Sequence, residues 1–189
     1  MSDIYYLANR FFDVQVQNGT IYSLLNTGDD LRSQFVGIGK GYSGITLRYR
    51  SEDGILHEWT PWKDASFDDS VRVVEANFET YEGVAENEHL SVKVIFSLRG
   101  EKLNQTVEVK SLKTNVVLED VCFAVPNNTG TKWGDIPGEK IMAHSWISGH
   151  GSHIIYTRCD GRGPILMMLP QDDTCIEFFT VNESRICYI

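Results

Sequence analysis

The fold is decided by a stretch near the start of the chain, residues 12–25, which reads FDVQVQNGTIYSLL. Apolar and polar residues alternate over residues 12–17, a period of two that is typical of a β-strand with one buried face. Asn18-Gly19 follows, and an apolar run resumes over residues 20–25. Asn-Gly between two such runs predicts a type I′ hairpin, because that turn needs positive φ at both central residues.

The same pattern recurs along the chain. Residues 45–50 and 55–59 flank a Ser-Glu-Asp-Gly turn, and residues 90–98 and 103–110 flank a turn that begins with Arg-Gly. Helical periodicity is confined to residues 29–36, which predicts one or two helical turns. Further segments with the composition of strands are residues 71–76, 116–125, 153–159, 165–169 and 174–181.

Many short strands joined by Gly, Asn and Asp turns predict an all-β fold, an antiparallel β-sandwich with little helix. The chain has neither an internal repeat nor a linker-like stretch, so residues 1–189 are expected to form a single β-sandwich domain. The sequence stops inside an apolar, β-prone run, residues 186–189. This ending predicts that the domain is the N-terminal part of a longer protein.

Composition and charge exclude several classes of protein. A content of 42% hydrophobic and 23% charged residues argues against disordered and low-complexity chains. The formal charge is −9 and no basic stripe occurs, so nucleic acid is not expected as a partner. No apolar run approaches the roughly 18 residues of a membrane-spanning helix, so no membrane partner is expected. The N-terminus lacks the basic and apolar regions of a signal peptide, which favours the cytoplasm.

The four cysteines are Cys122, Cys159, Cys175 and Cys187. None forms the C-x-x-C pair that is typical of structural zinc sites. Each lies in an apolar stretch, where a free thiol behaves as a small hydrophobic group. Buried thiols are therefore expected, although the even number leaves two disulfides open.

The segment richest in chemistry is residues 140–153, which contains His144, His150 and His153 beside Trp146. Glycines at its end favour a loop or a bulge, through which the backbone approaches a ligand closely. Histidine and tryptophan suit a sugar ring, because its C–H face stacks on the indole and its hydroxyl groups bond to imidazoles. The alternative is that Trp146 belongs to the core and that the histidines are ordinary surface residues.

Four other residues complete the candidate ligand-binding set. Arg158 and Asp160 lie in a predicted hairpin loop, and Trp133 lies in a loop rich in Gly, Asn and Thr. Glu177 lies within an apolar run, where a carboxylate must face water, a partner or a ligand. Glu177 and His153 are the candidates for acid–base catalysis, and a solvent-facing position is the alternative for each. A third interpretation is a transition-metal site, in which His150 and His153 hold one ion and Glu177 joins from a neighbouring strand. The H-x-x-H spacing alone is a weak signal, so no metal site is predicted, and no cofactor motif occurs.

The C-terminal part of the chain carries a resemblance to a known family. Its segments are residues 149–170, residues 174–179 with the sequence TCIEFF, and the shorter stretches 118–121 and 126–129. They resemble the N-terminal β-supersandwich domain of bacterial glycoside-hydrolase-like proteins that have a six-hairpin, (α/α)6 catalytic domain. The resemblance implies a galactose-mutarotase-like sandwich that packs against a downstream helical catalytic domain of the same chain and forms one wall of a carbohydrate cleft.

Catalysis in the mutarotase family uses two histidines and a glutamate on the concave sheet. His144 or His150, together with His153 and Glu177, imitates that set by residue type, but not by matching motif positions. No catalytic role is therefore transferred to these residues.

Three functional hypotheses follow. The first is a non-catalytic carbohydrate-associated domain of a glycoside hydrolase, which forms part of a glycan cleft or supports a helical catalytic barrel. The second is an autonomous aldose-epimerase-like enzyme that uses His and Glu on the concave sheet. The third is a purely structural interaction module. The acidic balance and the absence of a recognisable catalytic motif favour the first hypothesis, in which this part of the protein is not an enzyme.

Overall fold

The computed structural model describes residues 3–36, 41–76, 78–125, 141–148, 151–171, 177–180 and 185–188. Strands dominate these residues, and the helix among them is α1, with four residues, Pro61–Asp64. The strands are β1 (Tyr5–Ala8), β2 (Phe12–Gln17), β3 (Thr20–Asn26), β4 (Ile45–Arg50), β5 (Leu56–Trp59), β6 (Asp68–Glu75), β7 (Phe78–Glu86), β8 (Leu90–Arg99), β9 (Lys102–Ser111), β10 (Val117–Ala124), β11 (Ile141–Ser148), β12 (Gly151–Arg158), β13 (Leu166–Met168), β14 (Glu177–Thr180) and β15 (Arg185–Tyr188).

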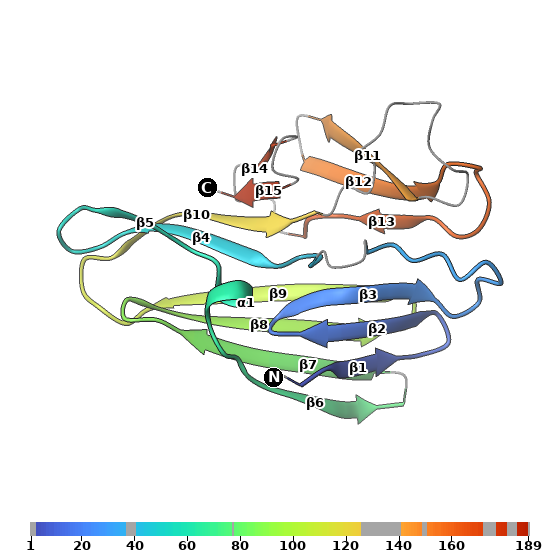
Figure 1. Ribbon diagram of the computed structural model, residues 1–189, viewed down its shortest axis with the longest axis horizontal. Coiled ribbons are helices and arrows are strands. Elements are labelled where there is room, and N and C mark those ends of the chain that lie inside the picture. Colours follow the sequence, from blue (N-terminus) through green and yellow to red (C-terminus); the bar gives the residue numbers. More distant parts are fainter. Residues whose placement is uncertain are drawn as a thin grey trace.

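The strands form sheets whose orders are β1-β2-β3, β14-β15-β10-β4-β5, β11-β12-β13 and β6-β7-β8-β9. Every pair of neighbouring strands in these sheets is antiparallel. Figure 1 shows two layers, with β6–β9 and β1–β3 in the lower one and the other two sheets in the upper one. The predicted all-β antiparallel sandwich is confirmed.

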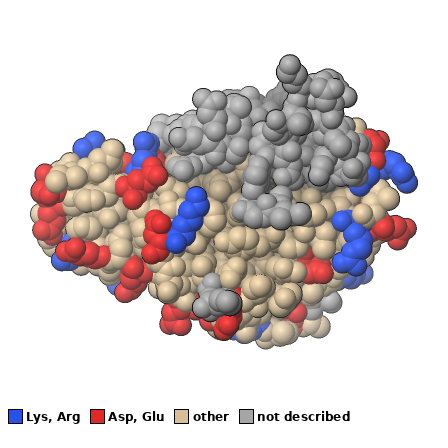
Figure 2. All heavy atoms as spheres, viewed as in Figure 1, with Lys and Arg blue, Asp and Glu red and all other residues tan. Residues whose placement is uncertain are grey.

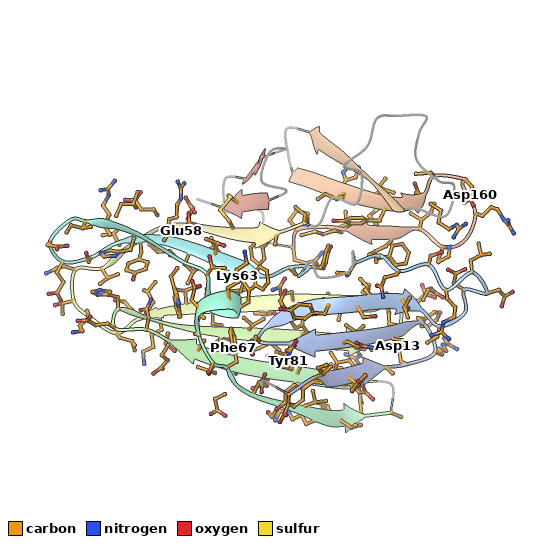
Figure 3. All side chains as sticks on the ribbon, viewed as in Figure 1. Asp13, Glu58, Lys63, Phe67, Tyr81 and Asp160 are labelled. Atoms are coloured by element: carbon orange, nitrogen blue, oxygen red, sulfur yellow. A yellow bond between two sulfur atoms is a disulfide. The ribbon has the colours of Figure 1, made fainter. Side chains whose placement is uncertain are left out.

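The hairpin predicted at Asn18-Gly19 joins β2 to β3. Asn18 has φ 48° and Gly19 has φ 64°, the positive values that the predicted turn requires. The tip of this hairpin lies against the β6–β9 sheet, where the hydroxyl group of Tyr81 accepts a hydrogen bond of 2.8 Å from the Gly19 N–H. Figure 3 shows Tyr81 close to Phe67 in the lower layer.

The other two predicted hairpins are also present. Gly54 supplies a φ of 79° between β4 and β5, and Gly100 supplies a φ of 56° between β8 and β9. In β8 the side chains alternate strictly between buried and half-buried, because one face of the strand is turned to the core.

One hydrophobic core contains residues from every sheet. Each sheet contributes a buried side chain to it: Leu7 from β1, Phe96 from β8, Leu47 from β4 and Tyr156 from β12. Tyr156 packs edge-on against Tyr42, with ring centroids 5.8 Å apart, so the β11–β13 sheet is joined to the rest of the sandwich.

The helix predicted over residues 29–36 is wrong. The Asp29 carboxylate accepts hydrogen bonds from the N–H groups of Leu31 and Ser33, at 3.1 and 2.7 Å, and so forms a turn. An aspartate side chain that bonds to nearby backbone competes with helix formation. The short helix α1 begins instead at Pro61, a residue whose fixed φ suits a first helical position. Within the described ranges, no helix has the length and apolar character needed to cross a membrane.

The expectation of buried thiols is wrong for two of the cysteines. Cys122 of β10 and Cys187 of β15 are register partners and form a disulfide with a Cα–Cα distance of 4.0 Å. Cys159 is a free thiol, as predicted, but it is half-buried and not buried, and Cys175 lies outside the described residues. The two bonded cysteines are 65 positions apart, so their spacing in the sequence does not reveal that their strands are neighbours.

Candidate functional site

The register of β11 and β12 places three predicted site residues near one another in the β11–β13 sheet. Trp146 is the register partner of His153, and His144 lies two positions before Trp146 in β11. Ile154, the neighbour of His153, is buried on the opposite, core-facing side. His153 itself is half-buried. The role of these residues in ligand binding stays a prediction.

Of the other predicted ligand-binding residues, some lie outside the part of the chain that the structure describes. Trp133 and His150 lie outside the described residues. Glu177 is the first residue of β14, and its register partner is Tyr188 of β15. Strands β12 and β14 contact each other, so the strand of His153 and the strand of Glu177 are neighbours.

Arg158 and Asp160 form a separate group. Arg158 occupies the face of β12 opposite to His153, because five positions separate them along an alternating strand. Its Nε and Nη2 atoms lie 3.0 and 2.6 Å from the Asp160 carboxylate oxygens, which lowers the pKa of Asp160 to about 2. Only 9% of the Arg158 side chain is exposed. These two residues therefore stabilise the loop after β12 and do not join the face that holds His153.

A cavity of about 220 Å³ lies next to this loop, at the end of the sandwich. Turns and strand ends that are distant in the sequence build it: the β1–β2 turn, the end of β3, the β8–β9 turn and the start of β13. Figure 1 places these turns at the right-hand end of the molecule, and Figure 3 places Asp160 there. The lining residues are Phe11, Phe12, Asn26, Phe35, Glu101, Pro164, Ile165 and Leu166.

The cavity combines aromatic walls with two polar groups. Phe11 and Phe12 are half-buried, and Phe12 also packs against the hydrophobic core. Asn26 accepts a hydrogen bond of 2.9 Å from the Gly28 N–H through Oδ1, which fixes its amide. Glu101 is exposed at the β8–β9 turn. Aromatic faces beside an amide and a carboxylate suit a ligand that has both apolar and hydroxyl-bearing surfaces.

The cavity residues form no predicted site. Phe12 is predicted only as the beginning of a strand and Phe35 as part of a helix, whereas Phe11, Asn26 and Glu101 are far apart in the chain and carry no prediction. A local signal was present, because Asn9 favours a turn and two consecutive aromatic residues, Phe11 and Phe12, follow it.

A serine and a histidine meet at the opposite end of the sandwich. The Ser51 hydroxyl lies 2.8 Å from His57 Nε2 and 2.5 Å from Asp53 Oδ1. The carboxylate therefore contacts the serine, whereas in a catalytic triad it orients the histidine. Ser51 is 7% exposed, and His57 stacks on Tyr49 with ring centroids 5.2 Å apart. This arrangement stabilises the β4–β5 turn and does not present a nucleophile.

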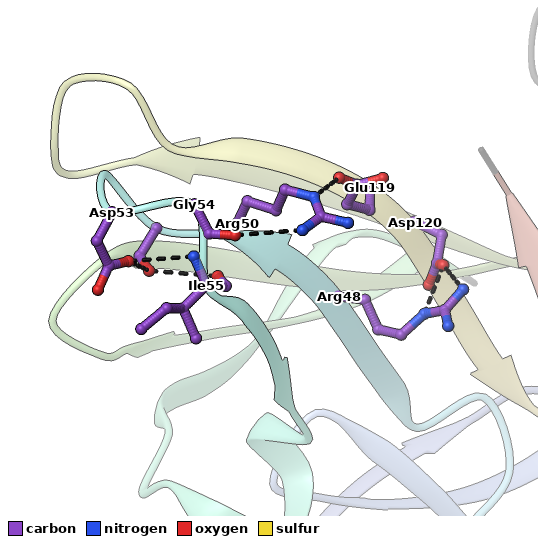
Figure 4. A network of polar contacts seen from close by, with 8 residues as sticks. Arg48, Arg50, Asp53, Gly54, Ile55, Glu119 and Asp120 are labelled. Atoms are coloured by element: carbon purple, nitrogen blue, oxygen red, sulfur yellow. Dashed lines mark hydrogen bonds and ion pairs between the residues drawn. The ribbon is translucent and has the colours of Figure 1, made fainter.

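Ion pairs on β4 and β10 stabilise the same end of the molecule, as Figure 4 shows. Arg48 Nε donates to Asp120 Oδ2 at 2.6 Å, which raises the pKa of Arg48, and Asp120 is 3% exposed. Arg50 Nε donates to Glu119 Oε1 at 2.6 Å, and its Nη1 donates to the Gly54 carbonyl oxygen at 3.2 Å. Because these charges are paired with one another, they are structural.

No group of three or more His, Cys, Asp or Glu side chains in the described part of the chain is arranged to hold a metal ion. In comparisons with known proteins, the chain matches no protein-family model, and no curated protein is significantly similar to it.

Proposed function

We propose that this chain is a non-catalytic carbohydrate-associated β-sandwich domain that binds a saccharide in the end cavity. The observation that carries this proposal is the pairing of the Phe11 and Phe12 rings with Asn26 and Glu101 around one opening. Sugars present C–H faces that pack on aromatic rings and hydroxyl groups that need amide or carboxylate partners.

The size of the cavity limits the size of the ligand that it can hold. Its volume of about 220 Å³ is below the roughly 300–1,000 Å³ of pockets that enclose drug-sized ligands. The rim is open, since Ile165 is 66% exposed. A single sugar residue at the end of a chain, or projecting from one, fits this description better than an enclosed oligosaccharide does.

The wider setting of the domain is part of the same proposal. The resemblance of residues 149–170 to β-supersandwich domains supports a role beside a helical glycoside-hydrolase barrel of the same protein. In that setting the cavity would belong to the wall of a glycan cleft, and hydrolysis would take place in the barrel.

Binding is tested with the purified chain. Tetragalacturonic acid, its methyl ester, cellotetraose and mannotetraose are titrated while the backbone amide signals are followed by NMR. We expect at least one probe to shift the amide signals of the turns around the cavity, with a Kd near the millimolar range, because a small sugar site supplies only about 4 kcal/mol.

A matched pair of variants locates the site. Phe11→Ala is expected to weaken the binding about tenfold, because it removes one aromatic wall. Phe78→Ala is the control: like Phe11, whose ring has Arg10 packed over it, Phe78 is half-buried beneath an arginine, but it does not line the cavity. Equal effects of the two substitutions, or binding by neither the native chain nor its variants, would contradict the proposal.

The contact between β12 and β14 supports a second candidate, an aldose-epimerase-like activity of His153 and Glu177. Anomer interconversion needs an acid and a base on either side of the sugar ring, which His153 and Glu177 would supply. The reaction is followed by polarimetry with the purified chain. Loss of a measurable rate in Glu177→Gln would support the epimerase. A rate equal to that of buffer would leave the non-catalytic proposal in place.

A further inference from the structure

The charge at the cavity end is unlike that of the whole chain. Four segments meet there, residues 9–12, 26–35, 99–102 and 158–166, and together they contain six cations and four acids, in a chain whose formal charge is −9. The cations are Arg10, Arg32, Arg99, Lys102, Arg158 and Arg162, and the acids are Asp29, Asp30, Glu101 and Asp160. Asp13, next to Phe12, and Glu75, which pairs with Arg99, adjoin these segments, so this end is close to neutral and not strongly acidic. Figure 2 shows Lys and Arg side chains interspersed with Asp and Glu side chains at this right-hand end.

Two of the four acidic side chains already interact with other groups of the fold. Asp160 is paired with Arg158, and Asp29 is hydrogen-bonded to the backbone of its own turn. Arg99 is paired with Glu75 at 3.2 Å. Among the described residues, no ion pair engages the remaining cations, Arg10, Arg32, Lys102 and Arg162.

Arg10 is the cation placed best to meet a ligand. Its guanidinium carbon lies 4.6 Å from the centroid of the Phe11 ring, which is a wall of the cavity. Arg10 is exposed, and stacking on the ring holds the planar group beside the opening. A guanidinium presents two parallel N–H donors, which match the two oxygens of a carboxylate.

We propose that the ligand of the cavity is a saccharide that carries a carboxylate group, which Arg10 binds while the sugar ring packs on Phe11. This inference rests on the proposed carbohydrate function. Glu101 opposes the negative charge of such a ligand, and its carboxylate oxygens accept hydrogen bonds from the ring hydroxyl groups instead. The opposition implies that removal of the Glu101 charge tightens the binding of an acidic sugar.

The test compares two probes that differ in charge. Tetragalacturonic acid and its methyl ester have the same sugar backbone, and only the acid carries carboxylates. We expect the acid to bind about tenfold more tightly by isothermal titration calorimetry at low ionic strength, the effect of one charge-assisted contact. Added salt is expected to reduce that ratio, because the contact is partly exposed.

Three variants assign the effect to residues. Arg10→Gln is expected to remove most of the preference for the acid, and Glu101→Gln is expected to increase it. Arg72→Gln is the control, because this arginine of β6 is also largely exposed but is paired with Glu82, whereas Arg10 lies over the ring of the cavity residue Phe11. The preference for the acid is expected to be unchanged in this control.

The outcomes separate this inference from the function on which it rests. Equal binding of acid and ester, or tighter binding of the ester, would overturn the inference and leave the carbohydrate function standing. A preference for the acid that survives Arg10→Gln would overturn the assignment to Arg10. If neither probe nor the neutral tetrasaccharides bind, both the inference and the proposed function are wrong.

Discussion

The backbone N–H of Gly19 donates a hydrogen bond of 2.8 Å to the hydroxyl group of Tyr81, 62 residues further along the chain. Both groups are buried, and the Tyr81 hydroxyl in turn lies 3.2 Å from Asp69 Oδ2. Tyr5 packs edge-on against the same ring, with centroids 5.7 Å apart. The Asn18-Gly19 turn is thereby attached to the β6–β9 sheet by one side chain.

Removal of this hydroxyl in Tyr81→Phe is expected to destabilise the fold by about 1–3 kcal/mol, because it leaves the Gly19 N–H buried without a partner. Urea unfolding followed by tryptophan fluorescence measures the change in the free energy of unfolding. Tyr6→Phe is the control, since Tyr6 is 60% exposed. An equal, small effect of both substitutions would show that the Gly19–Tyr81 bond contributes nothing to stability.

Gly19→Ala tests the close approach of the hairpin to the sheet. A Cβ atom there would lie 2.6 Å from Cε1 of Phe67, and the φ of 64° strains any L-residue. Gly54→Ala carries a comparable strain at φ 79°, but its Cβ meets nothing within 4 Å. We expect the Gly54 variant to lose about 1 kcal/mol and the Gly19 variant about 1–3 kcal/mol more in urea unfolding.

Relief of the crowding provides the check on that explanation. In a Phe67→Leu background, the additional cost of Gly19→Ala is expected to shrink, because the ring that meets the new methyl group is gone. If the cost is the same in both backgrounds, the loss comes from the backbone conformation and not from Phe67.

The fold was predictable because its signals are local. Alternation in residues 12–17 and the Asn18-Gly19 turn report on neighbouring residues, and the structure has the hairpin where the pattern places it. Strand β7 escaped prediction, because its Thr-Tyr-Glu-Gly sequence breaks the alternation of apolar and polar residues. The Asp29 turn escaped it as well, because apolar spacing does not register a carboxylate that bonds to backbone.

The cavity and the disulfide were not predictable in the same way. The cavity joins Phe11, Asn26 and Glu101, and the pairing that brings them together is set by strands distant in the sequence. Trp146 and His153 differ from these residues, because they lie close in sequence on adjacent strands and are register partners in one hairpin.

The ion pair of Arg158 and Asp160 predicts a pH dependence. The hydrogen bonds from Arg158 lower the pKa of Asp160 to about 2 in the folded chain, below the ordinary value of an unfolded aspartate. The contribution of the pair to stability is therefore present above about pH 4 and lost as the pH falls through about 2. In urea unfolding, Asp160→Asn is expected to be less stable than the native chain at pH 7, with the difference vanishing near pH 2.

An NMR titration of the Asp160 carboxyl carbon tests the cause directly. Arg158→Gln is expected to raise the pKa of Asp160 towards its ordinary value, whereas Arg162→Gln keeps the backbone N–H that donates to Asp160 Oδ1 and has a smaller effect. A larger rise in Arg162→Gln than in Arg158→Gln would contradict the assignment.

The Cys122–Cys187 disulfide predicts that reduction weakens the attachment of β15. The bond closes a segment of 65 residues that contains the whole β11–β13 sheet, and a loop of that length corresponds to about 4 kcal/mol in the chain-entropy description. In urea unfolding, dithiothreitol is expected to destabilise the native chain and to have no effect on a Cys122→Ala/Cys187→Ala variant. Faster hydrogen exchange of the β15 amides after reduction would accompany the loss.

Alkylation in denaturant at the moment of cell lysis, before air can oxidise the thiols, decides whether the bond forms in the cell. Mass spectrometry of chain alkylated without prior reduction is expected to find the label on Cys159 and to find Cys122 and Cys187 joined in one peptide pair. Disulfides persist in oxidising compartments, so this result would speak against the cytoplasmic location favoured by the sequence. Full labelling of Cys122 and Cys187 in chain alkylated at lysis would show instead that the two sulfurs are thiols held next to each other.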